Sequence, residues 1–389
     1  MAFDCYCAIC GVGFCGMHIE APSEATLERR RRWIEKRCRA LQAGKDFRQV
    51  SHEGEDNEEP VRSYDPRIVG WDNISWLYKA HCLGLDENAK PGAPKAFLSD
   101  EGYYADIGEF VVKAKSDGSR SRSQRVYSCY GHGSEEAPGP VLPFHWCCFE
   151  ILTRALTGTT DTKNVNLDVL YNIMTPLCNM SGSALQLSYG DDIQRSQGRY
   201  WECIPGAEAS IPSPSCYCAA HPVETPGLDE YIQSNMETNN GLKTPFAELD
   251  LRGREPTSPF GQLPIEIVLQ ICKFLPADSL KALTEASLYI HRVTQDNLFW
   301  KQFMQRNMPW FWELQTAKNQ KIPADLNYKR MYMWLDKMTA PRYGMDDVKL
   351  IGVANRRRIW GVCEDLADRY SKSLNQNQPT VSAVQWGSG

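Results

Sequence analysis

The sequence predicts an α+β protein, in which a mixed N-terminal domain is followed by a small helical unit and a helical tail. Helix and strand patterns alternate along the first half of the chain, whereas helical spacing dominates after Pro264. Nine of the 23 prolines lie between Pro205 and Pro264, so this stretch cannot support a packed core and is predicted to be a linker with short ordered pieces. The predicted regions are, in order, 1–205, 206–258, 259–307 and 308–389.

Composition narrows the class of protein. No run of about 18 uncharged apolar residues is present, so no transmembrane helix is expected, and "MAFDCYCAIC" lacks the pattern of a secretory signal. The net charge of −5 gives no global reason to expect nucleic-acid binding. Fifteen scattered cysteines do not form the even, dense pattern of a secreted disulfide scaffold. We therefore expect a protein of the cytoplasm, the nucleus or both, with neither a membrane nor a nucleic acid as its partner.

The elements of the N-terminal domain follow from local patterns. Residues 26–42 predict a basic helix with a solvated cationic face, and the helical spacing of Ile74, Leu77, Tyr78 and His81 predicts another helix. The remaining predicted elements are a strand at 108–114, a helix beginning near Phe144 and ending near Gly158, a helix from about Asn166 to Cys178, and two strands in "ALQLSYGD" and "RYWECIPG".

Cysteine spacing predicts a structural zinc site in this domain. In "CAICG", Cys7 and Cys10 are two residues apart and Gly11 follows, which is the pattern of a zinc knuckle. His145 and Cys148 occupy positions i and i+3 at the start of a predicted helix, so they share one face. A knuckle and a helix-borne pair together form a treble-clef-like arrangement, with four ligands that close a tetrahedral site.

Other pairs compete for the same role. Cys129 with His132 in "CYGH", and Cys216, Cys218 and His221 in "CYCAAH", have suitable residue types, and Cys5 or Cys15 could replace a member of the knuckle. We favour His145 and Cys148 because of the helix geometry, and because 216–221 lies in linker-like sequence. A metal there would attach the N-terminus to a helix some 135 residues later.

The stretch "LPIEIVLQICKFLPADSLKAL", residues 263–283, carries two apolar rows on one predicted helix. Ile267, Ile271 and Phe274 form one row, and a second row runs beside it. Three or four short helices in about 45 residues bury little surface. We therefore expect one row to pack against the neighbouring helices and the other to bind another protein.

These residues resemble the F-box family over 260 to about 305. The resemblance is carried by "LPxEI", by apolar positions downstream, and by the closing "LFW" at Leu298 to Trp300; Leu288 and Ile290 depart from the usual pattern. Weaker similarity along the chain is to a filamentous-fungal F-box group. The resemblance implies that these residues bind a Skp-family adaptor: Leu263, Pro264, Glu266, Ile267, Ile271, Phe274, Leu275, Leu280, Leu283 and Trp300.

The same resemblance implies the function. F-box proteins connect a target, through the Skp adaptor and a cullin, to a ubiquitin ligase, so the chain is expected to recruit a target without catalysing a reaction itself. The alternative is a zinc-stabilised interaction module that acts outside ubiquitination. No leucine-rich or propeller repeat follows the F-box, so the target surface is expected in the N-terminal domain or the last 80 residues.

The sequence contains no nucleotide-binding, serine-hydrolase or metalloprotease motif. Cys147 or Cys148 beside His145 could form a thiol nucleophile, but the flanking Trp146 and Phe149 would desolvate it. In the tail, "WFWEL" at 310–314 is predicted to extend the helical core. Arg356 to Arg358 are predicted to be solvated and to precede a helix whose inward residues are Ile359, Trp360, Cys363 and Leu366.

Overall fold

The structure is a computed structural model, and it divides the chain into two compact units. Unit 1 comprises residues 1–224 and 341–389, and unit 2 comprises residues 225–340. The residues that the structure describes are 5–14, 39, 43, 75–86, 88–105, 108–112, 125–131, 140–178, 183–190, 193, 217–238, 259–314, 326–341 and 349–376. No described helix is long and apolar enough to cross a membrane.

Unit 1 contains an antiparallel sheet in the order β2-β1-β3-β4-β5, with β6 paired to β1. Leu83 of β1 lies opposite Leu98 of β2 and Leu142 of β6; Leu83 and Leu142 are buried in the core, and Leu98 is half-buried. The strands are β1 (Ala80–Leu85), β2 (Ala96–Leu98), β3 (Gly102–Ala105), β4 (Glu109–Val112), β5 (Arg125–Ser128) and β6 (Leu142–His145).

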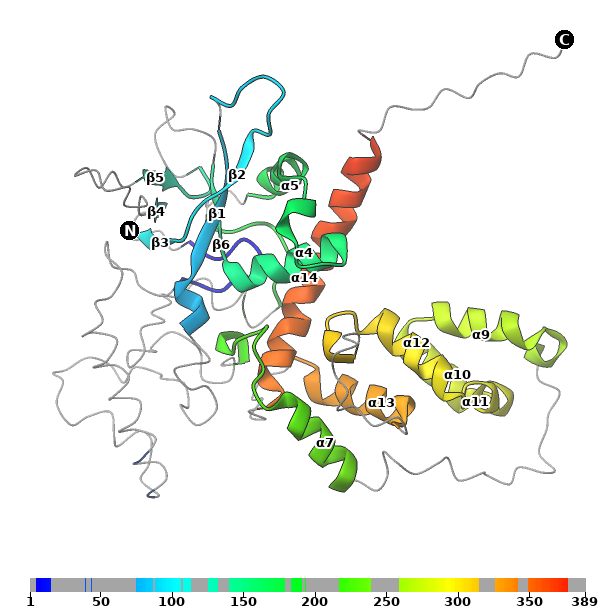
Figure 1. The fold of residues 1–389 in the computed structure, drawn as a ribbon. Coiled ribbons are helices and arrows are strands. Elements are labelled where there is room, and N and C mark those ends of the chain that lie inside the picture. The colour runs from blue at the N-terminus through cyan, green and yellow to red at the C-terminus, as the bar shows by residue number, and fades with distance from the viewer. Residues whose placement is uncertain are drawn as a thin grey trace, which may run out of the picture. The chain divides into compact units, whose positions relative to one another are not determined.

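In the described part of unit 1, the sheet is accompanied by the helices α4 (Trp146–Thr157), α5 (Leu167–Met174) and α14 (Ile351–Gln376). The α4 helix ends at Gly158, which adopts the left-handed conformation with φ of 74°, and the Asn166 side chain caps α5 by accepting from the Val169 N–H. The α14 helix packs against both α4 and α5 (Figure 1). The described part of unit 1 also contains the short 3-10 helices η1 (Ser75–Tyr78), η3 (Thr162–Asn164) and η4 (Thr175–Leu177).

Unit 2 is helical in the residues that are described. Its core is aromatic: the Trp300 ring contacts Phe299, Phe303 and Tyr332, and the Trp300 indole N–H donates to the Thr294 carbonyl over 2.6 Å. The elements are α7 (Leu228–Thr238), η6 (Pro259–Gln262), α9 (Ile265–Phe274), α10 (Ala277–Ala286), α11 (Leu288–Val293), α12 (Asn297–Asn307), η7 (Trp312–Leu314) and α13 (Tyr328–Thr339). Trp310 and Phe311 are buried, as the core reading of "WFWEL" predicts.

Mixed helix and strand content agrees with the α+β prediction, and the strand predicted at 108–114 is β4. Two predicted elements are wrong. The expected helix through His81 is a short 3-10 turn followed by β1, and "ALQLSYGD" forms bends with one isolated bridge, Cys178 to Leu185. Both segments are short and apolar, and periodicity separates helix from strand poorly in such runs. The predicted helix at 26–42 and the strand in "RYWECIPG" lie outside the described residues, apart from Arg39 in a helical conformation.

The compact units cross the predicted boundaries in two places. The tail does not form one extension, because α13 packs on α12 in unit 2 whereas α14 packs on α4 and α5 in unit 1. Within the predicted linker, residues 217–224 belong to unit 1 and α7 belongs to unit 2. Packing against elements distant in sequence decides both placements, and local composition does not report such packing.

Candidate metal centre and docking surface

The N-terminal turn folds as a knuckle. The Cys7 N–H donates to the Val12 carbonyl and the Gly11 N–H to the Cys7 carbonyl, each over 2.9 Å, and Tyr6 bridges to Gly13. Gly11 has a φ of +72°, in the region that glycine adopts without strain. The Cys10 N–H points at the Cys7 sulfur over 3.4 Å, so the turn directs a backbone dipole toward that thiol.

The second pair comes from the junction of β6 and α4. His145 is the residue before the first turn of α4, and Cys148 lies within that turn, so both side chains project from one end of the helix. The His145 N–H points at the Cys7 sulfur over 3.4 Å, and the His145 Nδ1 lies 3.5 Å from the Cys10 sulfur. The helix start is therefore in direct contact with the knuckle.

Cys7, Cys10, His145 and Cys148 form one buried group, whose four ligand atoms lie within 4.8 Å of one another. A tetrahedral zinc, with Zn–S near 2.3 Å and Zn–N near 2.0 Å, separates nitrogen from sulfur by about 3.5 Å and two sulfurs by about 3.8 Å. The measured separation of 3.5 Å between nitrogen and sulfur fits this geometry. Three thiols and one imidazole are also soft and borderline donors of the kind that zinc prefers. The group could therefore hold a metal ion.

The protonation of these thiols shows why a cation would be favoured. Burial raises the pKa of the Cys10 and Cys148 thiols well above the usual range. Burial also raises the pKa of Cys7, but hydrogen bonds from the Cys10 and Cys148 thiols, and the neighbouring His145, bring that pKa well below its ordinary value. Burial and the repulsion between neighbouring negative charges therefore favour ionisation of only one of the three thiols. A dication would stabilise all three.

The His145 ring is fixed by aromatic neighbours. Phe14 and Trp76 have ring centroids 4.7 Å and 4.8 Å from it. Its Nε2 is buried and has no hydrogen-bond partner among the described residues. The ring therefore presents Nδ1 to the thiols, and Nε2 faces away from them. The sequence did not predict which of the two nitrogens would face the thiols.

The competing cysteines do not join this group. Cys5, Cys129 and Cys218 are buried elsewhere in unit 1, and within the described ranges no second group of three or more His, Cys, Asp or Glu side chains is gathered for a metal. His221 serves a turn instead, since its Nδ1 accepts from the Val223 and Glu224 N–H groups over 3.1 and 2.9 Å. Cys15, His132 and Cys216 lie outside the described residues.

The environment does not favour a thiol nucleophile. Burial raises the pKa of the Cys147 thiol, and Cys148 belongs to the four-residue group. A buried protonated thiol is a poor nucleophile.

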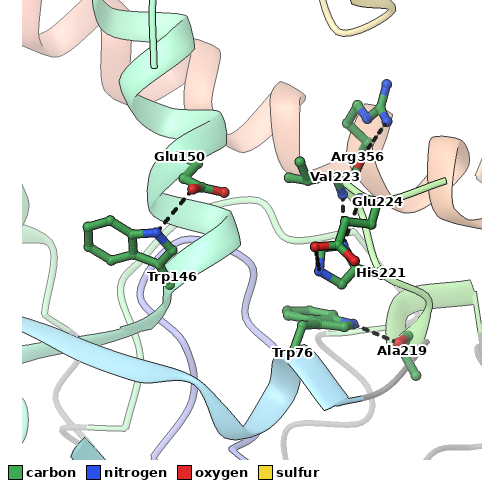
Figure 2. Close-up of polar contacts among 8 residues, drawn as sticks. All are labelled: Trp76, Trp146, Glu150, Ala219, His221, Val223, Glu224 and Arg356. Carbon is green, nitrogen blue, oxygen red and sulfur yellow. Dashed lines mark hydrogen bonds and ion pairs between the residues drawn. The ribbon is translucent and has the colours of Figure 1, made fainter. Parts of the chain in front are cut away.

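The prediction that the arginines at 356–358 are solvated is wrong for two of them, which lie within α14. Arg356 is fully buried and Arg358 is only 8% exposed, so they are not solvated. The Arg356 guanidinium donates to the carbonyls of Pro222 and Val223, while Asn355 donates to those of Cys218 and Ala220. Figure 2 shows this segment between α14 and Trp76, whose indole N–H donates to the Ala219 carbonyl over 2.9 Å. The segment 217–223 thereby joins α14 to η1 within unit 1.

In unit 2, the two rows of α9 have different environments. Val268 is 1% exposed and Cys272 is buried, so this row packs against the other helices. The other row is exposed and includes Phe274, at 71%. We call it the α9 apolar row, and it consists of Leu263, Ile267, Ile271 and Phe274. Arg306 lies over the Phe274 ring at 4.6 Å from its centroid, and Pro264 and Glu266 are also exposed beside the row.

Four other predicted adaptor contacts differ in exposure. Leu275 and Leu283 are half-buried, whereas Leu280 and Trp300 are each 1% exposed. The assignment of Leu280 and Trp300 to the docking surface is therefore corrected: they hold the helices of unit 2 together. Leu298, next to the buried Phe299 and Trp300, is exposed and was not singled out as a contact.

A family model described as F-box-like matches residues 260–306, which span η6 to α12. Neither the curated proteins nor the solved structures contain a match to the chain.

Proposed function

We propose that this chain, which carries an F-box-like domain at residues 260–306, is a non-catalytic, substrate-recruiting subunit of a Skp–cullin–F-box ubiquitin ligase. The α9 apolar row would bind a Skp-family adaptor and, through it, a cullin. Unit 1 would carry the surface for a protein target, and the complex would act in the cytoplasm or the nucleus.

The observation that carries the proposal is the split environment of α9. Burying a large aliphatic or aromatic side chain contributes about 1.5–3 kcal/mol, so an exposed row of four is costly unless a partner covers it. The packed row with Val268 and Cys272 holds the helix in place while the other row stays accessible. An apolar helix face presented in this way is a common mode of recognition between proteins.

Co-purification with a Skp-family adaptor tests the proposal. Ile271→Asp places a charge in the middle of the α9 apolar row and is expected to abolish capture of the adaptor and of the cullin. The matched control is Val126→Asp, which changes an exposed aliphatic residue of β5 in the same way, and it should leave capture unchanged. Capture that persists in Ile271→Asp would refute the assigned surface.

A second candidate function rests on the buried cysteine and histidine group. We propose that Cys7, Cys10, His145 and Cys148 bind a structural zinc ion in a treble-clef-like arrangement, with no ligand position left for water. If zinc is present and the adaptor is not captured, the chain is better described as a zinc-stabilised interaction module outside ubiquitination. Capture of the adaptor together with cullin would exclude that alternative.

Metal analysis of the purified chain tests the zinc proposal. We expect about one zinc per chain, a loss of zinc in Cys10→Ser, and a lower unfolding temperature after chelation, because a metal that binds only the folded state stabilises it. Cys82→Ser is the control, since Cys82 is buried in β1 of the same unit but outside the group, and it should retain zinc. A wild-type chain free of zinc after purification in zinc-containing medium would contradict the proposal.

A further inference from the structure

Arg358 of α14 is directed at the knuckle. Its Nη1 donates to the Cys10 carbonyl over 2.6 Å and to the Tyr189 carbonyl over 3.2 Å. Its Nε and Nη2 donate to the Asn355 side-chain oxygen over 3.3 and 3.0 Å. The guanidinium is thus buried, held in a fixed orientation, and placed against the backbone of a candidate metal ligand.

Among the described residues, every hydrogen-bond acceptor of Arg358 is a neutral oxygen. In the part of the chain that the structure describes, no carboxylate pairs with it, although a buried charge is normally paired with an opposite one. Its positive charge acts on two thiols, those of Cys10 and Cys363, which are both buried. Burial raises the pKa of the Cys363 thiol well above its usual range, so Cys363 is not the missing anion.

A metal-loaded centre would supply such an anion. One dication held by three thiolates and a neutral imidazole carries a net charge of −1. This is opposite in sign and equal in size to the charge of Arg358.

We propose that Arg358 is the counter-charge of the metal centre and that it couples the centre to the C-terminal helix. The inference rests on the zinc site proposed above. Arg358 is a positioning residue, since it touches the ligand backbone and does not bind the metal. Its position on α14 means that loading of the centre would strengthen the packing of a helix that is 348 residues away from Cys10 in sequence.

Two substitutions separate charge from hydrogen bonding in the full-length chain. Arg358→Lys keeps the charge and loses the planar fork, whereas Arg358→Gln keeps an amide donor and loses the charge. Zinc affinity would be measured by competition with a chelator of known affinity, on variants whose circular dichroism shows them to be folded. The control is Arg369→Gln, on the same helix, where Arg369 pairs with Asp365 at the surface.

We expect Arg358→Gln to bind zinc about 10- to 100-fold more weakly than the wild type, the range for outer partners of metal ligands. Arg358→Lys should stay within a few-fold of the wild type, and Arg369→Gln should not differ from it. Equal losses in the Lys and Gln variants, or no loss in either, would overturn the charge role while leaving the zinc site intact. A wild-type chain that binds no zinc would overturn the site itself.

A second measurement needs no variant. Hydrogen exchange of the wild-type chain, with zinc and after chelation, should show faster exchange of α14 amides around Arg358 when zinc is removed. Unchanged exchange in α14, with zinc demonstrably lost, would contradict the coupling.

Discussion

Gly11 illustrates how one residue sets the geometry of the knuckle. It adopts a φ of +72°, and a Cβ added there would lie 2.5 Å from the Cγ of Tyr189. The Tyr189 hydroxyl in turn donates to the Ala8 carbonyl inside the knuckle over 3.1 Å. The knuckle therefore requires both the backbone freedom and the small size of glycine at this position.

Gly11→Ala is expected to lower the free energy of unfolding of unit 1 by more than about 2 kcal/mol, because it adds a steric clash to the backbone strain. Gly158→Ala separates the two effects, since Gly158 has a φ of +74° but no atom within 4 Å of the added Cβ. It should cost only about 1 kcal/mol. Urea denaturation of both variants measures the difference, and equal costs would show that Tyr189 does not constrain the turn.

His221 gives a residue-scale prediction about pH. Burial, together with the positive charges of Lys79 and Arg356, lowers the pKa of His221, and Glu224 opposes this shift. Its Nδ1 accepts two backbone hydrogen bonds (Figure 2), and only the neutral ring can accept there. On acidification the unfolded chain takes up this proton first, so stability should fall as the pH drops below about 6.5, the ordinary histidine value, toward the lower folded-state pKa.

His221→Asn tests this sign, because an asparagine oxygen accepts from backbone N–H groups two and three residues later but does not titrate. Thermal unfolding across pH 5–8, a range chosen to bracket about 6.5, should show a shallower acid decline in the variant than in the wild type. Parallel pH profiles would mean that other groups account for the decline.

The grouping of Cys7, Cys10, His145 and Cys148 could be predicted from spacing, since a Cys-x-x-Cys-Gly turn and a helix-borne His and Cys each fix a local geometry. The burial of Arg358 could not. A run of three basic residues is usually solvated, and nothing local to residues 356–358 indicates that the knuckle lies against Arg358.

At the scale of elements, α9 shows that an excess of apolar surface can be read from sequence. Two apolar rows on one short helix predict two packing surfaces. In the structure, the row with Val268 and Cys272 packs against the other helices of unit 2. The β1 segment shows the opposite case. Leu77 and His81 have helical spacing, yet β1 pairs with β2 and β6, and this long-range pairing overrides a short periodic signal.

The helix α12 carries a prediction that separates core from surface. Trp300→Ala should destabilise unit 2 by about 3–5 kcal/mol, because the indole is 1% exposed and its N–H is bonded to Thr294. Leu298→Ala, two residues earlier and exposed, should cost less than about 0.5 kcal/mol. Denaturant unfolding followed by circular dichroism checks both, and a small effect of Trp300→Ala would return that residue to the docking surface.

At the scale of the molecule, unit 1 is built from two distant parts of the chain. The α14 helix packs against α4 and α5, and its buried face includes Ile359, Cys363 and Leu366. The inward face of this helix was predictable from its periodicity, but the domain that it joins was not, because helical spacing does not name a partner.

A chain ending at Pro341 lacks α14 and should lose the cooperative unfolding of unit 1, with faster hydrogen exchange in α4. Capture of the adaptor should persist, because α9 to α13 are all retained. The control is a chain ending at Gln376, which keeps all of α14. Normal exchange in α4 after truncation at Pro341 would show that α14 is dispensable for that unit.

The return of α14 to unit 1 imposes an order of events on a ribosome. Residues 225–340 emerge and can acquire their shape while the earlier part of the polypeptide still awaits its closing helix. During that interval the nascent chain would already display the α9 apolar row, the surface proposed for the adaptor. Synthesis of α14 would then decide when unit 1 is complete.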